Sequence, residues 1–184
     1  MILSNREILE ALEAGDIVID PFPHRDPTAT PFNTTAVDLR LGPTITIPKK
    51  LPVAQRLDQP YDSAFVAQNS DQYTCSAAQP VALEPYQFVL AQTMERVDLP
   101  IRKGRPTYAA RVEGKSSRAR LGMLIHFTAP TIHSGFNGKI TLEMINLSQN
   151  SIQLVPGIYI CQLIFERVSN EPANARNQFS GQET

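Results

Sequence analysis

Proline and glycine recur along the whole chain, and their spacing favours short strands over long helices. The 184 residues include 15 prolines and 9 glycines. A proline inside a helix removes a backbone hydrogen bond and clashes with the preceding turn. Between these breaks lie segments in which apolar and polar residues alternate, which is the period of a half-buried strand. The chain is therefore predicted to be mainly β.

The clearest alternation is in KITLEMINLS, residues 139–148, where one predicted face carries Ile140, Leu142 and Met144 and the other carries Thr141, Glu143 and Ile145. In AVDLRLG, residues 36–42, one face holds Val37, Leu39 and Leu41. TITIP, residues 44–48, is expected to continue that strand or pair with it. Further strands are expected at residues 17–20, 81–85, 87–100 and 106–114, and within 151–168 on both sides of a Val-Pro-Gly turn.

Two helices are predicted. Near the N-terminus, Ser4 and Glu7 have the spacing of a capping box, and Gly15 suits the C-terminal stop. The apolar side of this helix would hold Ile8, Leu9 and Leu12. The second helix is a short one after Gly114.

The chain is expected to form a single domain over residues 1–184. Residues 49–80 hold several prolines and little periodicity, so we expect an irregular excursion there and not a separate domain. Residues 169–184 are polar, which predicts a mobile C-terminal tail.

Composition excludes several classes of function. The formal net charge is -1, so no general attraction to nucleic acid or to an anionic membrane is expected. No apolar run approaches the roughly 20 residues that span a bilayer, and the N-terminal stretch does not resemble a secretory signal. We therefore expect a cytoplasmic protein. Cys75 and Cys161 are predicted to be buried thiols, and His24, His126 and His133 lack the spacing of a zinc site.

The segment EGKSSRARLG, residues 113–122, concentrates hydrogen-bonding groups. Ser116 or Ser117 could cap a helix that begins at about Arg118, and the exposed N–H groups with Lys115, Arg118 and Arg120 would then form an anion site. The segment is not a P-loop, because that motif requires glycine where the chain has Ala109. The alternative is a capped helix with solvated charges.

A second segment, HFTAPTIHSGFNGKITLE, covers residues 126–143. Glu143 falls in a predicted strand, where a carboxylate is costly unless it is paired or functional. It could be paired with Arg118 or Arg120, or it could act in catalysis. His133 could be a base, although a loop histidine is more often exposed or hydrogen-bonded. A third segment, QFSGQET at residues 178–184, is by default a disordered tail.

Together these segments and LVPGIYICQLIFE resemble, in order and spacing, the dCTP deaminase branch of the dUTPase-like superfamily. MILSNREILEALEAGDIVIDPF and TTAVDLRLG add to the resemblance, which is weakest over residues 49–80. It implies a distorted jelly-roll or β-clip fold and a homotrimer with active sites at subunit boundaries. It also implies binding of dCTP, dUTP or dTTP with Mg²⁺, which the phosphates would hold, and deamination without zinc. The C-terminal tail would close over the substrate.

The resemblance assigns catalytic roles to four residues. Glu143 matches the general base that activates water for attack at C4 of cytosine and then passes protons to N3 and the leaving ammonia. Ser116 matches the serine that positions the water and the ring, and Arg120 matches the arginine beside the catalytic carboxylate. Ala129 matches the small residue whose backbone helps to place the water or the ring.

The remaining matches are to substrate-binding positions. Lys115 and Ser117 correspond to phosphate-binding residues, and Gln182 to the tail glutamine that reaches the pyrimidine. The other predicted substrate-binding residues are Arg118, Thr131, His133, Thr141, Gln162 and Phe179.

The sequence departs from the family pattern at three places. His133 stands where the family commonly has the aspartate that activates water against the α-phosphate, which favours deamination without diphosphatase activity. Thr131 replaces an arginine of some deaminases. Gln178 and Phe179 stand where lysine and tyrosine are common.

Three functions are compatible with these residues. The leading one is hydrolytic deamination of dCTP to dUTP and ammonia, in the supply of dUMP and dTTP. The first alternative is dUTP diphosphatase activity, alone or combined with deamination. The second is a non-catalytic nucleotide-binding regulator, which has no need of a costly carboxylate at Glu143.

Overall fold

The computed structural model describes residues 1–56, 58, 63–170 and 172–173. The helices are α1 (Asn5–Glu13), α2 (Ser63–Gln68) and α3 (Ser116–Ala119). The strands are β1 (Val18–Asp20), β2 (Phe32–Asn33), β3 (Ala36–Pro48), β4 (Ser70–Thr74), β5 (Val81–Leu83), β6 (Phe88–Asp98), β7 (Tyr108–Gly114), β8 (Met123–Leu124), β9 (Thr131–Ile132), β10 (Asn137–Asn146), β11 (Ile152–Leu154) and β12 (Tyr159–Arg167).

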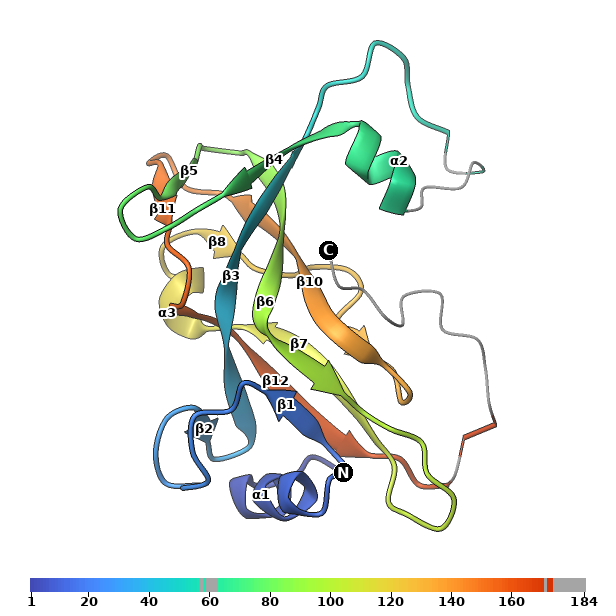
Figure 1. Ribbon diagram of the computed structural model, residues 1–184. Coiled ribbons are helices and arrows are strands. Elements are labelled where there is room, and N and C mark those ends of the chain that lie inside the picture. The colour runs from blue at the N-terminus through green and yellow to red at the C-terminus, as the bar shows by residue number, and fades with distance from the viewer. Residues whose placement is uncertain (57, 59–62, 171, 174–184) are drawn as a thin grey trace.

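The described strands form one large curled sheet and one small one. Ten strands join the large sheet, whose main order is β8-β10-β6-β3-β12-β7-β9. The side members are β1 on β6, with β2 and β4 on β3, and the small sheet pairs β11 with β5. The pairs in the large sheet are antiparallel. In Figure 1 the long strands cross the molecule, with α1 at one end and α2 at the other. The predicted mainly β class is confirmed by this architecture.

Strand β3 joins the two halves of the large sheet. Its first half pairs with β12, and its second half pairs with β4 and β6. The register with β6 shifts between Leu41 and Ile45, around Gly42 and Pro43. Proline lacks the ladder donor and is accommodated at such irregularities. TITIP is therefore the continuation of the AVDLRLG strand, one of the two arrangements expected.

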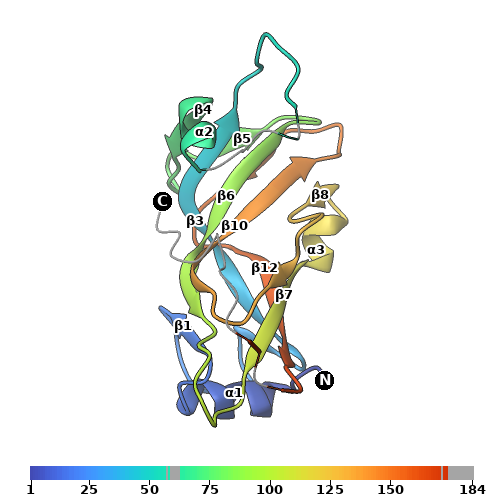
Figure 2. The same cartoon turned by 90° about the vertical axis from the view of Figure 1, so that its right-hand side faces the viewer.

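Helix α1 has the predicted capping box. The Ser4 hydroxyl accepts from the backbone N–H of Glu7 at 3.4 Å, and the Glu7 carboxylate accepts from the backbone N–H of Ser4 at 2.8 Å. Gly15 follows with φ +69°, a conformation that favours glycine. The buried face of the helix consists of Ile8, Ala11 and Leu12. Figure 2 shows α1 closing the end of the sheet beneath β1 and β7.

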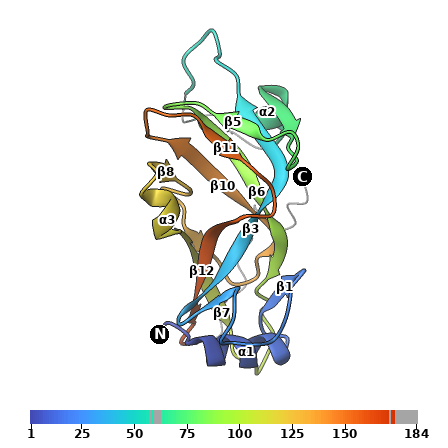
Figure 3. The same cartoon turned by 90° about the vertical axis from the view of Figure 1, so that its left-hand side faces the viewer.

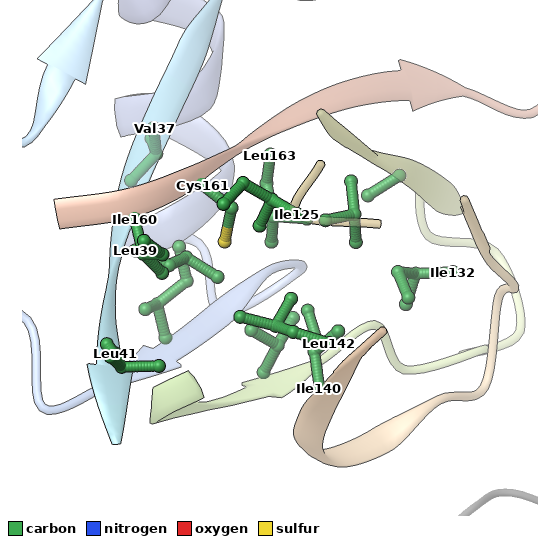
Figure 4. Close-up of a cluster of buried hydrophobic side chains, with 14 of the residues drawn as sticks. Val37, Leu39, Leu41, Ile125, Ile132, Ile140, Leu142, Ile160, Cys161 and Leu163 are labelled. Atoms are coloured by element: carbon green, nitrogen blue, oxygen red, sulfur yellow. The ribbon is translucent and has the colours of Figure 1, made fainter. Parts of the chain in front are cut away.

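The core lies inside the curl of the sheet (Figure 4). The predicted inward residues of β3 and β10 are each no more than 2% exposed: Val37, Leu39, Leu41, Ile140, Leu142 and Met144. The opposite face of β10, with Thr141, Glu143 and Ile145, is partly exposed, as the alternation predicts. Cys75 and Cys161 are both free and buried, also as predicted.

The structure differs from the sequence prediction in one segment. Residues 49–80 are more regular than expected, since they contain α2 and β4, and β4 pairs with the second half of β3. The two strands predicted on either side of the Val-Pro-Gly turn are both present, and they lie in different sheets (Figure 3). β11 pairs with β5, whereas β12 lies between β3 and β7. In the described part of the chain, no helix is long and apolar enough to cross a membrane.

Candidate active site

The EGKSSRARLG segment forms the end of β7 and the single turn α3. The helix begins at Ser116, earlier than expected, and neither serine caps it. Its N-cap is Lys115, whose side chain makes no capping hydrogen bond. The prediction of a serine cap and a start at Arg118 is therefore wrong, because Lys115 already has the extended backbone of an N-cap. One turn has only a small dipole, so the cationic side chains must supply most of any attraction for an anion.

Lys115 is held by Asp38 of β3, the strand on the other side of β12, and Asn33 of β2 supports Asp38. Its ammonium donates to Asp38 Oδ2 on β3. Asp38 Oδ1 accepts from the Asn33 side-chain amide at 2.8 Å. The Asp38 side chain is 7% exposed and that of Lys115 is 22% exposed. The predicted phosphate-binding lysine thus has a fixed direction.

Glu143 lies in the middle of β10, opposite Leu90 of β6. Its Oε2 atom is buried and has no hydrogen-bond partner among the described residues. No ion pair joins it to Arg118 or Arg120 in the described part of the chain, so the alternative of a purely structural ion pair is contradicted. A buried, unpartnered carboxylate oxygen is rare and calls for a ligand, a water or a catalytic role.

The segment after β8 crosses the Glu143 face of the sheet. β8 pairs with β10 at Leu124 and Ile145, two residues along β10 from Glu143, and the pairing ends there. The next ring, Phe127, packs edge-on against Phe88 of β6, with centroids 5.9 Å apart. Ile145 and Phe88 are directly paired, so the segment runs over this part of β10.

Within this segment, His126 contacts the predicted Ala129. Its Nε2 lies 2.8 Å from the Ala129 carbonyl oxygen, a contact in which only a protonated nitrogen can donate. Its Nδ1 is buried without a partner, as is Nε of Arg118. Three unpartnered polar atoms of different character therefore come from α3, from the segment after β8 and from β10. Arg118 Nε can supply a hydrogen-bond donor, His126 Nδ1 a second ring nitrogen, and Glu143 Oε2 an oxygen that accepts a proton.

The other predicted residues lie on α3, β7's neighbours β9 and β12, β10 and the loop after β8. Ser116, Ser117, Arg120 and Ala129 are exposed, and Thr141 shares the partly exposed face of β10 with Glu143. Gln162 of β12 is paired in register with Asp38 on one side and with Glu113 on the other. Thr131 and His133 are exposed at β9 and just after it, and Thr131 is paired with Arg111 of β7. Phe179 and Gln182 lie outside the described residues.

A hollow of about 660 Å³ adjoins α3, with lining residues Arg120, Leu121, Gly122, Ser148, Asn150, Ser151 and Ile152. It includes Arg120 but not Glu143. In the single chain, therefore, the predicted residues are not enclosed together in this hollow. In the described part of the chain, no group of three or more His, Cys, Asp or Glu side chains could hold a metal ion.

Sequence reasoning missed two residues of this region, Asp38 and His126. Asp38 stands in the strand segment AVDLRLG, where an acidic residue between apolar ones is the available signal. His126 was considered only for metal binding. Asp38 acts on Lys115, 77 residues away, so no local spacing identifies it, whereas the contact of His126 with Ala129 spans only three residues.

Comparison with known proteins places the chain in a family. The family model described as dCTP deaminase-like matches residues 2–168. A "dCTP deaminase, dUMP-forming" from Methanobrevibacter smithii is 36% identical over 168 residues, which is 91% of this chain and 81% of the relative. One from Thermobifida fusca is 36% identical over 177 residues, 95% of this chain and 82% of the relative. A "dCTP deaminase" from Halorubrum lacusprofundi is 36% identical over 174 residues, 92% and 79% of the two chains.

The chain belongs to the dCTP deaminase-like family. Among solved structures, the 2′-deoxycytidine 5′-triphosphate deaminase from Agrobacterium tumefaciens aligns with a TM-score of 0.67 at 18% identity. The alignment covers 91% of this chain and 48% of that chain, so this protein spans about half the length of that structure. At this identity the match shows the shared fold. The family predicted from the sequence motifs is therefore confirmed.

Proposed function

We propose that the protein catalyses the hydrolytic deamination of dCTP to dUTP and ammonia, with Glu143 as the general base. The buried, unpartnered Oε2 of Glu143 is the observation that carries the proposal. The names of the relatives support the substrate. A carboxylate in this position has a lone pair for a water proton, which no donor among the described residues occupies.

The proposed sequence of proton transfers keeps atoms and charge in balance. Glu143 takes a proton from water as the oxygen attacks C4 of the cytosine ring. The carboxylic acid then passes that proton to N3, and a second proton from the added hydroxyl reaches the departing amino group as the C4–N bond breaks. General acid–base catalysis of this kind contributes about 10²–10⁴-fold.

Ser116, Arg120 and Ala129 would position the reactants. Ser116 and Arg120 present exposed donors at α3, and the Ala129 carbonyl is held in place by His126. Lys115, Ser117 and Arg118 would face the phosphates. Thr131, Thr141, His133 and Gln162 are proposed as further substrate contacts, with Phe179 and Gln182 of the tail.

A magnesium ion fits this site if the triphosphate brings it. Mg²⁺ is usually bound through substrate phosphates, few carboxylates and water, and the described residues lack a carboxylate cage of their own. When bound, the ion would neutralise phosphate charge. In this chain, the side chains of Lys115 and Arg118 would share in neutralising the phosphate charge.

The homotrimer is also part of the proposal. Exposed apolar side chains gather around α3 and β8, namely Leu121, Leu124, Phe127 and Leu147. The Gly122 carbonyl oxygen accepts a hydrogen bond from the backbone N–H of Leu147 at 2.8 Å, which places Leu147 beside the residue that follows Leu121. A neighbouring subunit would cover the patch and complete the site beside Arg120. Sedimentation equilibrium would give three times the 20.4 kDa mass of the chain. We also propose that the enzyme works in the cytoplasm.

The product distinguishes the proposal from a second candidate function, in which dCTP is converted to dUMP. Several relatives are named "dCTP deaminase, dUMP-forming", which favours the second function for those proteins. His133, in place of the expected aspartate, favours dUTP. The test is to incubate the protein with Mg²⁺ and dCTP, and separately with dUTP, and to resolve the nucleotides by ion exchange.

Each outcome of that experiment selects one function. Conversion of dCTP to dUTP with dUTP untouched supports deamination alone. Release of dUMP and pyrophosphate supports the dUMP-forming or diphosphatase function, and would show that His133 does not prevent it. No change in either nucleotide would favour a binding protein without turnover.

A further inference from the structure

The chain Asn33–Asp38–Lys115 connects β2, β3 and the residue that precedes α3. We infer that Asp38, supported by Asn33, is a positioning residue that fixes the Lys115 ammonium for the phosphates of the substrate. The inference rests on the proposed function, because Lys115 is a phosphate contact only if the site takes a nucleotide. It adds two residues that neither the motifs nor the comparisons assign.

Both oxygens of the Asp38 carboxylate are engaged. Oδ2 accepts from Lys115, and Oδ1 accepts from the Asn33 amide at 2.8 Å. The backbone N–H of Asp38 donates to the Pro31 carbonyl at 2.8 Å, and Asn33 is itself held in the β2–β3 pairing. A carboxylate fixed at both oxygens and at its backbone cannot turn, so the ammonium bound to it has a fixed position.

The Lys115 side chain must extend across β12 to contact Asp38. Lys115 follows β7, whose Glu113 is paired with Gln162 of β12, and Gln162 is paired on its other side with Asp38 of β3. Two strand spacings amount to about 10 Å, which the lysine and aspartate side chains cover only together and with the lysine extended. A lysine carries about 2 kcal/mol of rotamer entropy, and ordering it before the ligand arrives removes that cost from binding.

The ammonium remains available for a ligand. It has three N–H donors, of which the pairing with Asp38 needs one. The side chain keeps 22% exposure, whereas Asp38 keeps 7%. The buried carboxylate thus lies behind the ammonium, and the exposed Ser116 and Ser117 follow directly in the chain.

Charge alone predicts the opposite effect of Asp38 on phosphate binding. A carboxylate near a triphosphate repels it, so removing the charge would tighten binding if position did not matter. Positioning predicts weaker binding, because the lysine then loses its anchor. The sign of the change in affinity therefore separates the two effects.

The experiment measures the Kd of inorganic triphosphate by calorimetry, and kcat and KM for dCTP, on the full chain. The variants are Asp38→Asn, Asn33→Ala, Lys115→Met and the double variant Asp38→Asn/Lys115→Met. For Asp38→Asn we expect the Kd of triphosphate and the KM for dCTP to rise about five- to tenfold, with kcat within about twofold. Asn33→Ala should act in the same direction more weakly, and the double variant should bind no more weakly than Lys115→Met alone.

The matched control is Glu166→Gln, which removes another carboxylate–cation pair of the same sheet. Glu166 binds Arg111 at 2.8 Å, away from α3, and its loss should leave the Kd of triphosphate unchanged. Tighter or unchanged triphosphate binding by folded Asp38→Asn would overturn the inference. If Asp38→Asn does not fold, the exposed Asn33→Ala decides, and an unchanged Kd there overturns it.

The proposed function and the inference fail in different ways. A parent protein that binds triphosphate but leaves dCTP unchanged would contradict the deaminase proposal, while the triphosphate Kd values still judge Asp38. If the parent protein deaminates dCTP and its KM equals that of Asp38→Asn, the inference alone is contradicted. A parent protein that binds no triphosphate would overturn the inference at once.

Discussion

Lys115 and Asp38 are 77 residues apart in the sequence, yet the Lys115 ammonium is bound by the buried Asp38 carboxylate. The pair exists because β12 lies between β3 and β7 and brings their ends to the same face of the sheet. A charge that is 7% exposed needs such a partner. The pair therefore ties the folding of the sheet to the orientation of the candidate phosphate-binding lysine.

Loss of Lys115 should destabilise the fold. Lys115→Met leaves the Asp38 carboxylate buried without its cation, and breaking a buried pair on one side costs about 3–5 kcal/mol. Urea unfolding followed by circular dichroism would measure the change in the free energy of unfolding. Adding Asp38→Asn should recover much of the loss, since the uncompensated charge is then gone. A loss below about 1 kcal/mol, the range of exposed pairs, would contradict this account.

Glu143→Gln should bind dCTP but turn it over at least about 10²-fold more slowly, because the amide keeps the shape and cannot accept the proton of water. Rapid-quench measurement of kcat, with dCTP affinity from calorimetry, would test this. Glu166→Gln serves as the control, since it changes a strand carboxylate that is paired with Arg111. Near-normal turnover by Glu143→Gln would show that another group is the base.

Gly42→Ala should destabilise the fold through a direct clash. A Cβ at Gly42 would lie 2.9 Å from the backbone carbonyl oxygen of Gln92 on β6, and backbone in a sheet cannot move aside easily. Overpacking of this kind costs about 1–3 kcal/mol. Gly114→Ala is the matched control, because its Cβ would meet Ile125 at an ordinary 3.6 Å. Equal melting temperatures for the two variants would contradict the prediction.

The stability of the protein should fall in alkaline solution. Burial is the main cause that raises the pKa of the Cys161 thiol, with Glu95 and Asp38 adding to it, and burial also raises the pKa of Cys75. In the unfolded chain a thiol ionises near pH 8.5, whereas the folded chain keeps Cys161 neutral. As the pH rises, the unfolded state therefore loses these thiol protons first. The contribution of the neutral thiols to the free energy of unfolding is complete below about pH 8.5 and declines above it.

Unfolding curves from pH 7 to 10 would measure that decline. Cys161→Ala should be less stable at pH 7 because it leaves a cavity, but its stability should fall less steeply with pH. A thiol reagent should label both cysteines only as fast as the protein opens, since both are buried. Rapid labelling of the folded protein would contradict the burial of Cys75 and Cys161.

Several local features were predictable because neighbours in sequence produce them. The Ser4–Glu7 capping box needs four consecutive residues, and it forms as predicted. The alternation in residues 139–148 gives the faces of β10, because a strand turns its side chains to opposite sides at every step. The family motifs likewise depend on residue identity and order, which the sequence states directly.

Other features depend on which strands become neighbours. The sequence leaves open whether Glu143 pairs with an arginine or acts in catalysis, and only the packing of β10 shows that its Oε2 has no partner among the described residues. The same packing brings the segment of His126 over that strand. The regularity of residues 49–80 was missed because β4 is stabilised by pairing with β3 and has little alternation of its own.

The sequence by itself determined the β class of the protein, its capped N-terminal helix, the two faces of its central strands and its family. Periodicity, capping and motif order are properties of nearby residues, so they survive without knowledge of the fold. The tertiary structure decided the start of α3, the partners of β11 and β12, the unpartnered Glu143 oxygen and the Asn33–Asp38–Lys115 chain. These features depend on burial and on contacts between strands that are distant in sequence. Such contacts form only when the sheet has closed around its core.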